Sequence, residues 1–161
     1  MHPSTQKIIP NLWFDRNAEE AVAFYVSLFD DGRVASVARY GADGPGPVGE
    51  VMAIGFEIAG QSFAAINGGP HFSFTGAISL FIGCSSQAEL DTLWAKLSDG
   101  GAPQSCGWIV DRFGVTWQVN AAEIGTWLAD PDAERSARVM RAMLPMTKID
   151  IAALRRAYDG G

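Results

Sequence analysis

The sequence predicts an α+β fold made of two βαβββ-like modules that can pair their mixed sheets, followed by a helical C-terminal extension. Several short segments alternate apolar and polar residues with period two, which is typical of strands covered on one face. The same strand and helix pattern occurs twice, and helical spacing takes over after Asn120. We expect one domain over 1–128, with modules at about 7–68 and 77–120, and the extension over 129–161.

The first module is predicted to start with a strand over 8–14 and a helix that follows Asn17. Asparagine suits the N-cap position, and the two glutamates that follow it favour the positive end of the helix dipole. Strands are then expected over 33–40, 51–58 and 62–67, since apolar residues alternate there. The helix carries an apolar stripe at helical spacing, formed by Ala21, Phe24, Tyr25 and Leu28.

The second module repeats these signals at an offset of 86 − 17 = 69 residues, taken from Ser86 and Asn17. Ser86 and Glu89 have the spacing of a capping box, so a helix is predicted there after a strand over 77–84. Short strands are expected over 102–110 and 115–120. Cap, stripe and glycine stop all recur together, which favours a duplicated module.

The extension is predicted to hold two helices, over 131–144 and 150–158. Asp130 with Pro131 has the pattern of an N-cap followed by proline at the first helical position. The first of these helices carries apolar residues that could bury against a partner, which motivates a hypothesis of a dimeric interaction protein. These residues form a stripe at helical spacing: Val139, Met140, Met143 and Leu144.

Composition excludes several classes of function. The net charge is −6, and an acidic surface repels nucleic-acid phosphates, so we expect no nucleic-acid partner. No apolar run approaches the roughly 20 residues of a membrane span, so no membrane partner is expected. The start lacks a signal-peptide pattern and the two cysteines form no disulfide framework, which predicts a cytoplasmic protein with free thiols.

Four segments resemble one family: PNLWFDRNAEEAVAFY (10–25), NGGPH (67–71), CGWIVDRFGVTWQ (106–118) and the tail from Asp130 to KIDIAAL (148–154). They are similar to the PhnB-like branch of the vicinal oxygen chelate (glyoxalase/bleomycin-resistance) superfamily, whose members often carry the label demethylubiquinone methyltransferase. The resemblance implies paired modules whose sheets form a cup, usually in a homodimer. It also implies a small ligand in the cup, often held with a divalent metal.

The resemblance places four metal-ligand positions at Pro10, at Phe63 or Ala65, at Ser79 and at Gln118. Proline, phenylalanine and alanine have no donor side chain, and serine and glutamine are weak neutral donors. We therefore expect no metal cofactor, although the family often uses one. A metal-dependent enzyme of the glyoxalase or dioxygenase type remains an alternative, as does the methyltransferase of the family label.

The predicted ligand is a small, neutral, partly apolar molecule. Gln118 and Asn67 would orient it, while His71 and Trp108 would stand at the mouth. His71 is also the candidate catalytic base, although a loop histidine bonded to backbone is the simpler reading. Strand parity counted from Pro10 predicts that the cup is lined by Leu12, Phe63, Ala65, Asn67, Ser79, Phe81, Thr116 and Gln118.

Two other motifs have simpler explanations. The segment 44–49 matches GxGxxG, but a strand is predicted after it where phosphate binding needs a helix N-terminus, so a plain loop is expected. Trp13 and Trp117 are predicted to face the helices. Cys106 is predicted to be a small buried thiol, although pairing with His71 as a nucleophile is conceivable.

Overall fold

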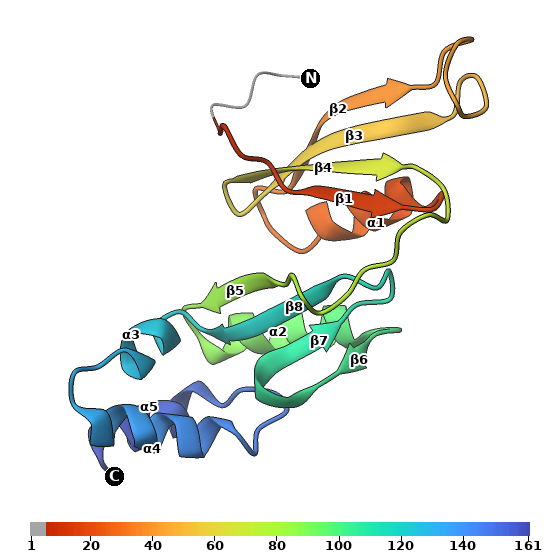
Figure 1. The fold of residues 1–161 in the computed structure, drawn as a ribbon. Coiled ribbons are helices and arrows are strands. Elements are labelled where there is room, and N and C mark those ends of the chain that lie inside the picture. The colour runs from red at the N-terminus through yellow and green to blue at the C-terminus, as the bar shows by residue number, and fades with distance from the viewer. Residues whose placement is uncertain (1–5) are drawn as a thin grey trace. The chain divides into compact units, whose positions relative to one another are not determined.

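The computed structural model describes residues 6–161, which divide after Ser73 into two compact units. Each unit contains one strand–helix–strand–strand–strand module with a four-stranded mixed sheet (Figure 1). The predicted α+β class, the two βαβββ modules and the C-terminal helices are therefore confirmed. A joint cup of the two sheets stays a prediction, and each unit is described by itself.

The first unit has a sheet with strand order β1-β4-β3-β2. The edge strand β1 pairs with β4 in parallel, and the other neighbours are antiparallel. Its elements are β1 (Asn11–Phe14), α1 (Ala18–Val26), β2 (Arg33–Arg39), β3 (Val51–Ile58) and β4 (Gln61–Asn67).

The core of the first unit lies between α1 and one face of this sheet. Tyr25 of α1 stacks on Phe56 of β3 with ring centroids 6.3 Å apart, and Phe56 stacks on Phe63 of β4 at 5.3 Å. All three side chains are buried, at 7% exposure or less. Burying such rings removes a large apolar area from water and so stabilises this unit.

The second unit has the equivalent strand order β5-β8-β7-β6, again with one parallel pair, β5 with β8. Helix α2 covers one face and buries Leu90, Leu93 and Leu97 against it. The elements of the module are β5 (Leu80–Cys84), α2 (Gln87–Ser98), β6 (Ala102–Pro103), the 3-10 turn η1 (Ser105–Gly107), β7 (Trp108–Val110) and β8 (Thr116–Ala121).

The repeat offset holds in three dimensions. Helices α1 and α2 begin at Ala18 and Gln87, which are 87 − 18 = 69 residues apart. The glycine after each helix also recurs at this offset and for one reason. A Cβ at Gly32 would lie 2.0 Å from the Val26 carbonyl oxygen, and one at Gly101 would lie 2.4 Å from the carbonyl oxygen of Leu97. Only glycine fits where the chain turns back on its helix end.

The two helix starts are capped differently. Ser86 Oγ accepts from the Glu89 N–H, and the Glu89 carboxylate accepts from the Ser85 N–H, so the predicted capping box is present in α2 with Ser85 as its second donor. The side chain of Asn17 makes no capping hydrogen bond. The amide oxygen of Asn67 caps α1 instead, by accepting from the Ala18 N–H.

The C-terminal part of the second unit has three helices: α3 (Ile124–Leu128), α4 (Ala133–Met143) and α5 (Ile151–Asp159). The short helix α3 was not predicted. Helix α4 begins after Asp132, two residues later than expected, because the carboxylate of Asp132 accepts from the first free amides of the helix. Helices α4 and α5 pack side by side (Figure 1), tied by Arg138, which donates to the Ala157 and Tyr158 carbonyls.

The apolar stripe of α4 is only partly buried within the chain. Val139 is fully buried and Met143 is partly covered, while Met140 and Leu144 are 39% and 58% exposed. Part of the apolar surface that motivated an interaction protein is therefore covered inside the second unit, and that hypothesis stays a prediction. Within residues 6–161, no helix combines the length and apolarity that crossing a bilayer requires.

Candidate functional site

The second unit contains an apolar pocket on the sheet face opposite α2. Its volume is about 360 Å³, within the range of small-molecule sites. Helices α3 and α4 supply the wall across from the sheet. The pocket is lined by Phe81, Cys106, Trp108, Gln118, Asn120, Ala122, Ile124, Gly125, Leu128 and Met143.

Strand register brings three of the predicted ligand residues together here. Phe81 of β5 and Trp108 of β7 both pair with Gln118 of β8, so the three side chains share one face. Phe81 is 52% exposed, although it is a large apolar residue. Phe81, Trp108 and Gln118 thus line one pocket, and their role in binding a ligand stays a prediction. Asn120 joins them because it lies two residues after Gln118.

Polar groups in the pocket are few and mostly oriented by the protein itself. Gln118 Nε2 donates to Ser79 Oγ at 2.8 Å, so Ser79 positions the amide, whose carbonyl oxygen remains to accept from a ligand. Asn120 Oδ1 accepts from the Ala121 N–H, and its Nδ2 lies 3.9 Å from the Met143 sulfur. Thr116 lies on the same face, two residues before Gln118, but is only 3% exposed.

The two cysteines have different surroundings. Cys106 lines the pocket with a left-handed backbone (φ 59°), and its Sγ lies 3.7 Å from the Met143 carbonyl oxygen. Cys84 is fully buried under α2. Burial, followed by the nearby Glu89 carboxylate, raises the pKa of the Cys84 thiol to about 12. Of the two, only Cys106 borders a cavity.

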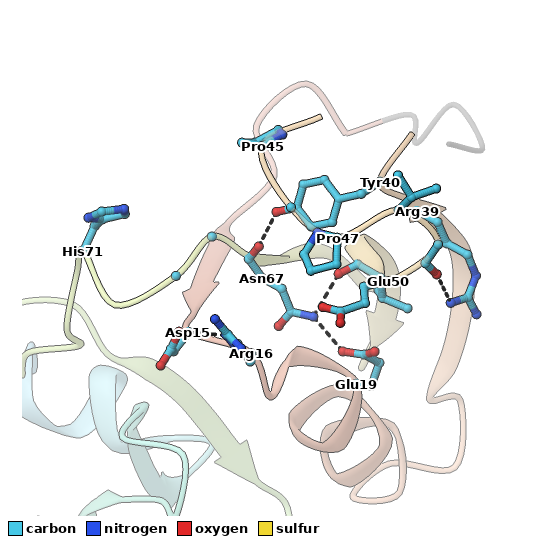
Figure 2. Close-up of a pocket in the computed structure, with 16 residues that line it drawn as sticks. Asp15, Arg16, Glu19, Arg39, Tyr40, Pro45, Pro47, Glu50, Asn67 and His71 are labelled. Carbon is cyan, nitrogen blue, oxygen red and sulfur yellow. Dashed lines mark hydrogen bonds and ion pairs between the residues drawn. The ribbon is translucent and has the colours of Figure 1, made fainter. Parts of the chain in front are cut away.

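A larger and more polar hollow, about 930 Å³, lies in the first unit (Figure 2). It is bounded by the ends of β1 and β4, the start of α1 and the loop between β2 and β3. Charged residues of both signs line it, including Asp15, Arg16, Glu19, Arg39 and Glu50.

Several polar groups of this hollow hold its own loop in place. Asn67 Nδ2 donates to Glu19 and to the Val51 carbonyl, and the hydroxyl of Tyr40 donates to the Asn67 carbonyl at 2.6 Å. Arg39 donates to the Gly49 carbonyl. These bonds assign Asn67 a structural role, joining the sheet, the helix and the loop.

His71 borders the same hollow, on the loop that follows β4. Its side chain is exposed and stands apart from the Asn67 and Tyr40 cluster in Figure 2. Its backbone N–H donates to the Gly69 carbonyl at 2.9 Å. Both roles considered for its imidazole, catalytic base and loop histidine, stay predictions.

Strand parity was predicted wrongly in the first module. Leu12, Phe63 and Ala65 are buried at 9%, 7% and 0% exposure on the face that α1 covers. Register shows this directly, since Leu12 pairs with Ala65, and Phe63 pairs with Phe56, which stacks under Tyr25. They belong to the core and line neither cavity.

The opposite face of β1 carries Trp13, which was predicted to face the helix. The Trp13 indole N–H donates to the Gly69 carbonyl at 2.9 Å, and its ring meets Phe72 edge-on at 5.0 Å. Trp117 does face α2: it is 2% exposed and donates to Asp111 Oδ2 at 2.8 Å. Parity counted within the second module was therefore correct.

The residues at the four family metal positions do not fit a divalent cation. Pro10 offers only its carbonyl, which accepts from the Ala64 N–H, and Phe63 and Ala65 are core residues. Ser79 and Gln118 bond to each other and are neutral. Such a donor set lacks the anionic or imidazole ligands that these metals require. Over residues 6–161, no three His, Cys, Asp or Glu side chains are grouped closely enough to hold a metal ion.

Comparison with known proteins shows which family the chain belongs to. A family described as 3-demethylubiquinone-9 3-methyltransferase matches residues 6–120. The chain belongs to this family. The PhnB-like resemblance is thereby confirmed. A putative 3-demethylubiquinone-9 3-methyltransferase of this family, the PhnB protein of Bacillus cereus, is 39% identical. The match spans 72% of this chain and 100% of that one, with a TM-score of 0.66.

A second solved structure, from Pseudomonas aeruginosa, is 26% identical with a TM-score of 0.60. That match covers 73% of this chain and 98% of the other. A search of curated proteins found no match. The family label names a methyltransferase, yet the GxGxxG-like loop at 44–49 leads into strand β3, as predicted, and not into a phosphate-binding helix.

Several pocket residues were missed by sequence reasoning. Asn120 could have been found, since it has the same strand parity as Gln118. Met143 was recognised as part of an apolar stripe, but nothing in the sequence places that stripe over the sheet. Ala122, Ile124, Gly125 and Leu128 lie in or beside the unpredicted helix α3.

Proposed function

We propose that the pocket of the second unit binds a small, uncharged, partly apolar molecule without the help of a metal ion. The observation that carries this proposal is the lining itself. None of the ten residues that form the pocket bears a charge, and two are aromatic side chains on neighbouring strands. Such a surface favours a flat neutral ligand over a polyanion or a cation.

The aromatic residues supply the binding surface. Phe81 and Trp108 flank Gln118 on the two neighbouring strands, so a flat molecule set against Gln118 would contact both rings. Phe81 is half exposed, and covering it with a ligand would remove apolar area from water at about 25 cal/mol per Å². This burial is the main source of affinity in the proposal.

Gln118 gives the pocket its polar selectivity. Ser79 accepts one N–H of Nε2 and fixes the amide, so that its carbonyl oxygen can accept a hydrogen bond from a ligand. A hydroxyl or amide N–H of the ligand would donate to the Gln118 carbonyl oxygen, whereas a carboxylate placed there would be repelled by that oxygen. The preferred class is therefore an uncharged aromatic molecule with one donor.

Metal independence is proposed from donor chemistry. Gln118 is the one family metal position that borders this pocket, and a single neutral amide oxygen holds no divalent ion by itself. The ligand would be retained by contact area and one hydrogen bond.

The test is a titration of the full chain with four single-ring probes: phenol, benzamide, benzoate and benzylammonium. We expect phenol and benzamide to raise the melting temperature and to give saturable heats in calorimetry. Benzoate and benzylammonium should do neither at the same concentrations. Binding of phenol should be unchanged after dialysis against EDTA.

Gln118→Ala should weaken phenol binding by several-fold, since one hydrogen bond is worth about 1 kcal/mol. Gln104→Ala is the matched control, because Gln104 lies in the same unit outside the pocket lining. Failure of all four probes to bind would overturn the proposal. Binding that disappears with EDTA and returns with Mn²⁺ or Zn²⁺ would replace it with a metal-dependent site.

A further inference from the structure

Half of the pocket wall in the second unit comes from a segment outside the family match. That match ends at residue 120, and five of the ten lining residues lie beyond it. The Bacillus cereus chain is matched over its full length and still leaves 100 − 72 = 28% of this chain without a counterpart. The five residues are Ala122, Ile124, Gly125, Leu128 and Met143.

This C-terminal segment is fastened to the module by main-chain bonds beside the pocket. The N–H groups of Cys106 and Gly107 donate to the carbonyls of Met146 and Thr147, at 2.7 and 2.9 Å. Ile149 is fully buried. A wall held by main-chain hydrogen bonds keeps a fixed position relative to the sheet, which a size-selective site needs.

A second set of bonds holds the start of α5. The side-chain amide of Gln87, at the start of α2, donates to the Ile149 carbonyl and accepts from the Ile151 N–H. Lys148 pairs with Asp91 of α2 at 2.6 Å. The chain between α4 and α5 is thus fixed to both the sheet side and the helix side of the module.

Two positions in the wall decide how much room a ligand has. Met143 projects from α4 and is oriented by Asn120, whose Nδ2 lies 3.9 Å from the sulfur. Gly125 of α3 lies at the pocket with nothing within 4 Å of the place where a Cβ would stand. Shortening the Met143 side chain would therefore enlarge the pocket, and adding a side chain at Gly125 would reduce it.

We propose that α3 and α4 set the size limit of the ligand in this pocket, with Met143 as the specificity-determining residue. This inference rests on the proposed function, because it concerns the same pocket. It adds that selectivity comes from a segment the family match does not include.

The test compares phenol with 2-naphthol, which carries the same hydroxyl on a second fused ring. The ratio of the two affinities in the wild-type protein is the reference. Met143→Ala should improve 2-naphthol relative to phenol by about tenfold, the effect expected for a few methylene-sized groups in an apolar pocket. Gly125→Leu should weaken phenol by about tenfold or more, because the new side chain occupies the ligand's space.

Each variant has a control on the same helix. Met140→Ala removes a 39% exposed methionine of α4 outside the lining, and Thr126→Leu adds the same leucine to the exposed neighbour of Gly125 in α3. Both controls should leave the two affinities within twofold of wild type. Circular dichroism and melting temperature establish that each variant is folded.

The outcomes separate the two proposals. Suppose Gln118→Ala weakens phenol while Met143→Ala and Gly125→Leu leave both affinities unchanged. The ligand then sits on the sheet away from the C-terminal wall, and the size inference is wrong while the proposed function stands. If wild-type protein binds neither probe, the proposed function fails. If Met140→Ala changes the ratio as much as Met143→Ala, selectivity does not come from Met143.

Discussion

The amide oxygen of Asn67 accepts a hydrogen bond from the main-chain N–H of Ala18 at 2.9 Å, so the last residue of β4 caps the first residue of α1. The cap comes from 49 residues away in sequence, and the neighbouring Asn17 makes no such bond. Helix and sheet in the first unit are therefore joined by the Asn67 side chain. Its Nδ2 also donates to the Glu19 carboxylate and to the Val51 carbonyl.

Replacing Asn67 by alanine should destabilise the first unit by roughly 1–2 kcal/mol, the usual cost of a lost cap. Urea unfolding followed by circular dichroism measures this. Asn17→Ala is the matched control and should cost under about 0.5 kcal/mol, since its side chain caps nothing. Equal costs for the two variants would show that the cap contributes nothing.

Asp111 is a buried carboxylate with three donors around it. Oδ1 accepts from the N–H groups of Phe113 and Val115, and Oδ2 accepts from the Trp117 indole; the residue is 4% exposed. Asp111→Asn should cost about 2–4 kcal/mol in urea unfolding, because an amide must turn a donor toward other donors.

The control for Asp111 is Asp99→Asn. The Asp99 side chain is 81% exposed and lies 3.6 Å from the Arg112 guanidinium. An exposed pair of this kind is worth little, so this variant should change stability by under about 0.5 kcal/mol. A cost for Asp99→Asn as large as that for Asp111→Asn would contradict the role given to the buried bonds.

Asp91 ties the C-terminal segment to α2 in a pH-dependent way. The hydrogen bond from Lys148, and then that from Gln87, holds the pKa of Asp91 below its usual 3.8. A lowered pKa means that the folded state favours the charged form. The stabilisation is therefore complete above pH 3.8 and is lost as pH falls through the lower folded value.

Melting temperature measured from pH 6 down to pH 2.5 should fall less steeply for Asp91→Asn than for wild type. Lys148→Met should flatten the same part of the curve, since it removes the partner whose bond lowers the pKa. If both variants follow the wild-type curve after a constant offset, this pair does not contribute to acid sensitivity.

The two thiols should differ in reactivity toward iodoacetamide at pH 8. Cys84 is buried and its pKa is raised to about 12, so almost none of it is thiolate at that pH. Cys106 is partly exposed at the pocket and should be alkylated first, as read by peptide mass spectrometry. Saturating phenol should slow the Cys106 reaction several-fold.

Single-thiol variants make that experiment unambiguous. Cys84→Ser retains only the pocket thiol and should show the full protection by phenol. Cys106→Ser should react slowly with or without it. Equal protection of both thiols would indicate that phenol acts by stabilising the whole protein instead of covering Cys106.

The duplicated module was predictable because its signals are local. Caps, stripes and glycine stops recur at one offset, and the helices start where that offset requires, at Ala18 and Gln87. Parity in the second sheet was predictable for the same reason, since Trp117 alternates cleanly with its polar neighbours Thr116 and Gln118.

Parity in the first sheet was not predictable from the sequence. Leu12, Trp13 and Phe14 are three large apolar residues in a row, so period two gives no preference for either face. The structure resolves this through packing, because Leu12 and Phe14 are buried while the Trp13 indole bonds to the loop at Gly69.

The C-terminal wall of the pocket was unpredictable for a different reason. Helix α3 is only five residues long, too short for a periodic signal. The docking of residues 146–149 depends on main-chain N–H donors at Cys106 and Gly107. Cys106 presents its N–H from a left-handed backbone conformation, which a cysteine in the sequence does not indicate.

The bonds from Cys106 and Gly107 to Met146 and Thr147 use backbone atoms on both sides. Substitution at any of these four positions leaves the attachment groups in place, unless proline removes a donor or a side chain crowds Gly107, where a Cβ would lie 2.5 Å from the Val119 carbonyl oxygen. Substitutions in the C-terminal segment would thus change which ligands fit the pocket, while the main-chain hydrogen bonds that attach the segment are kept. This segment is therefore a natural place to engineer new ligand preferences.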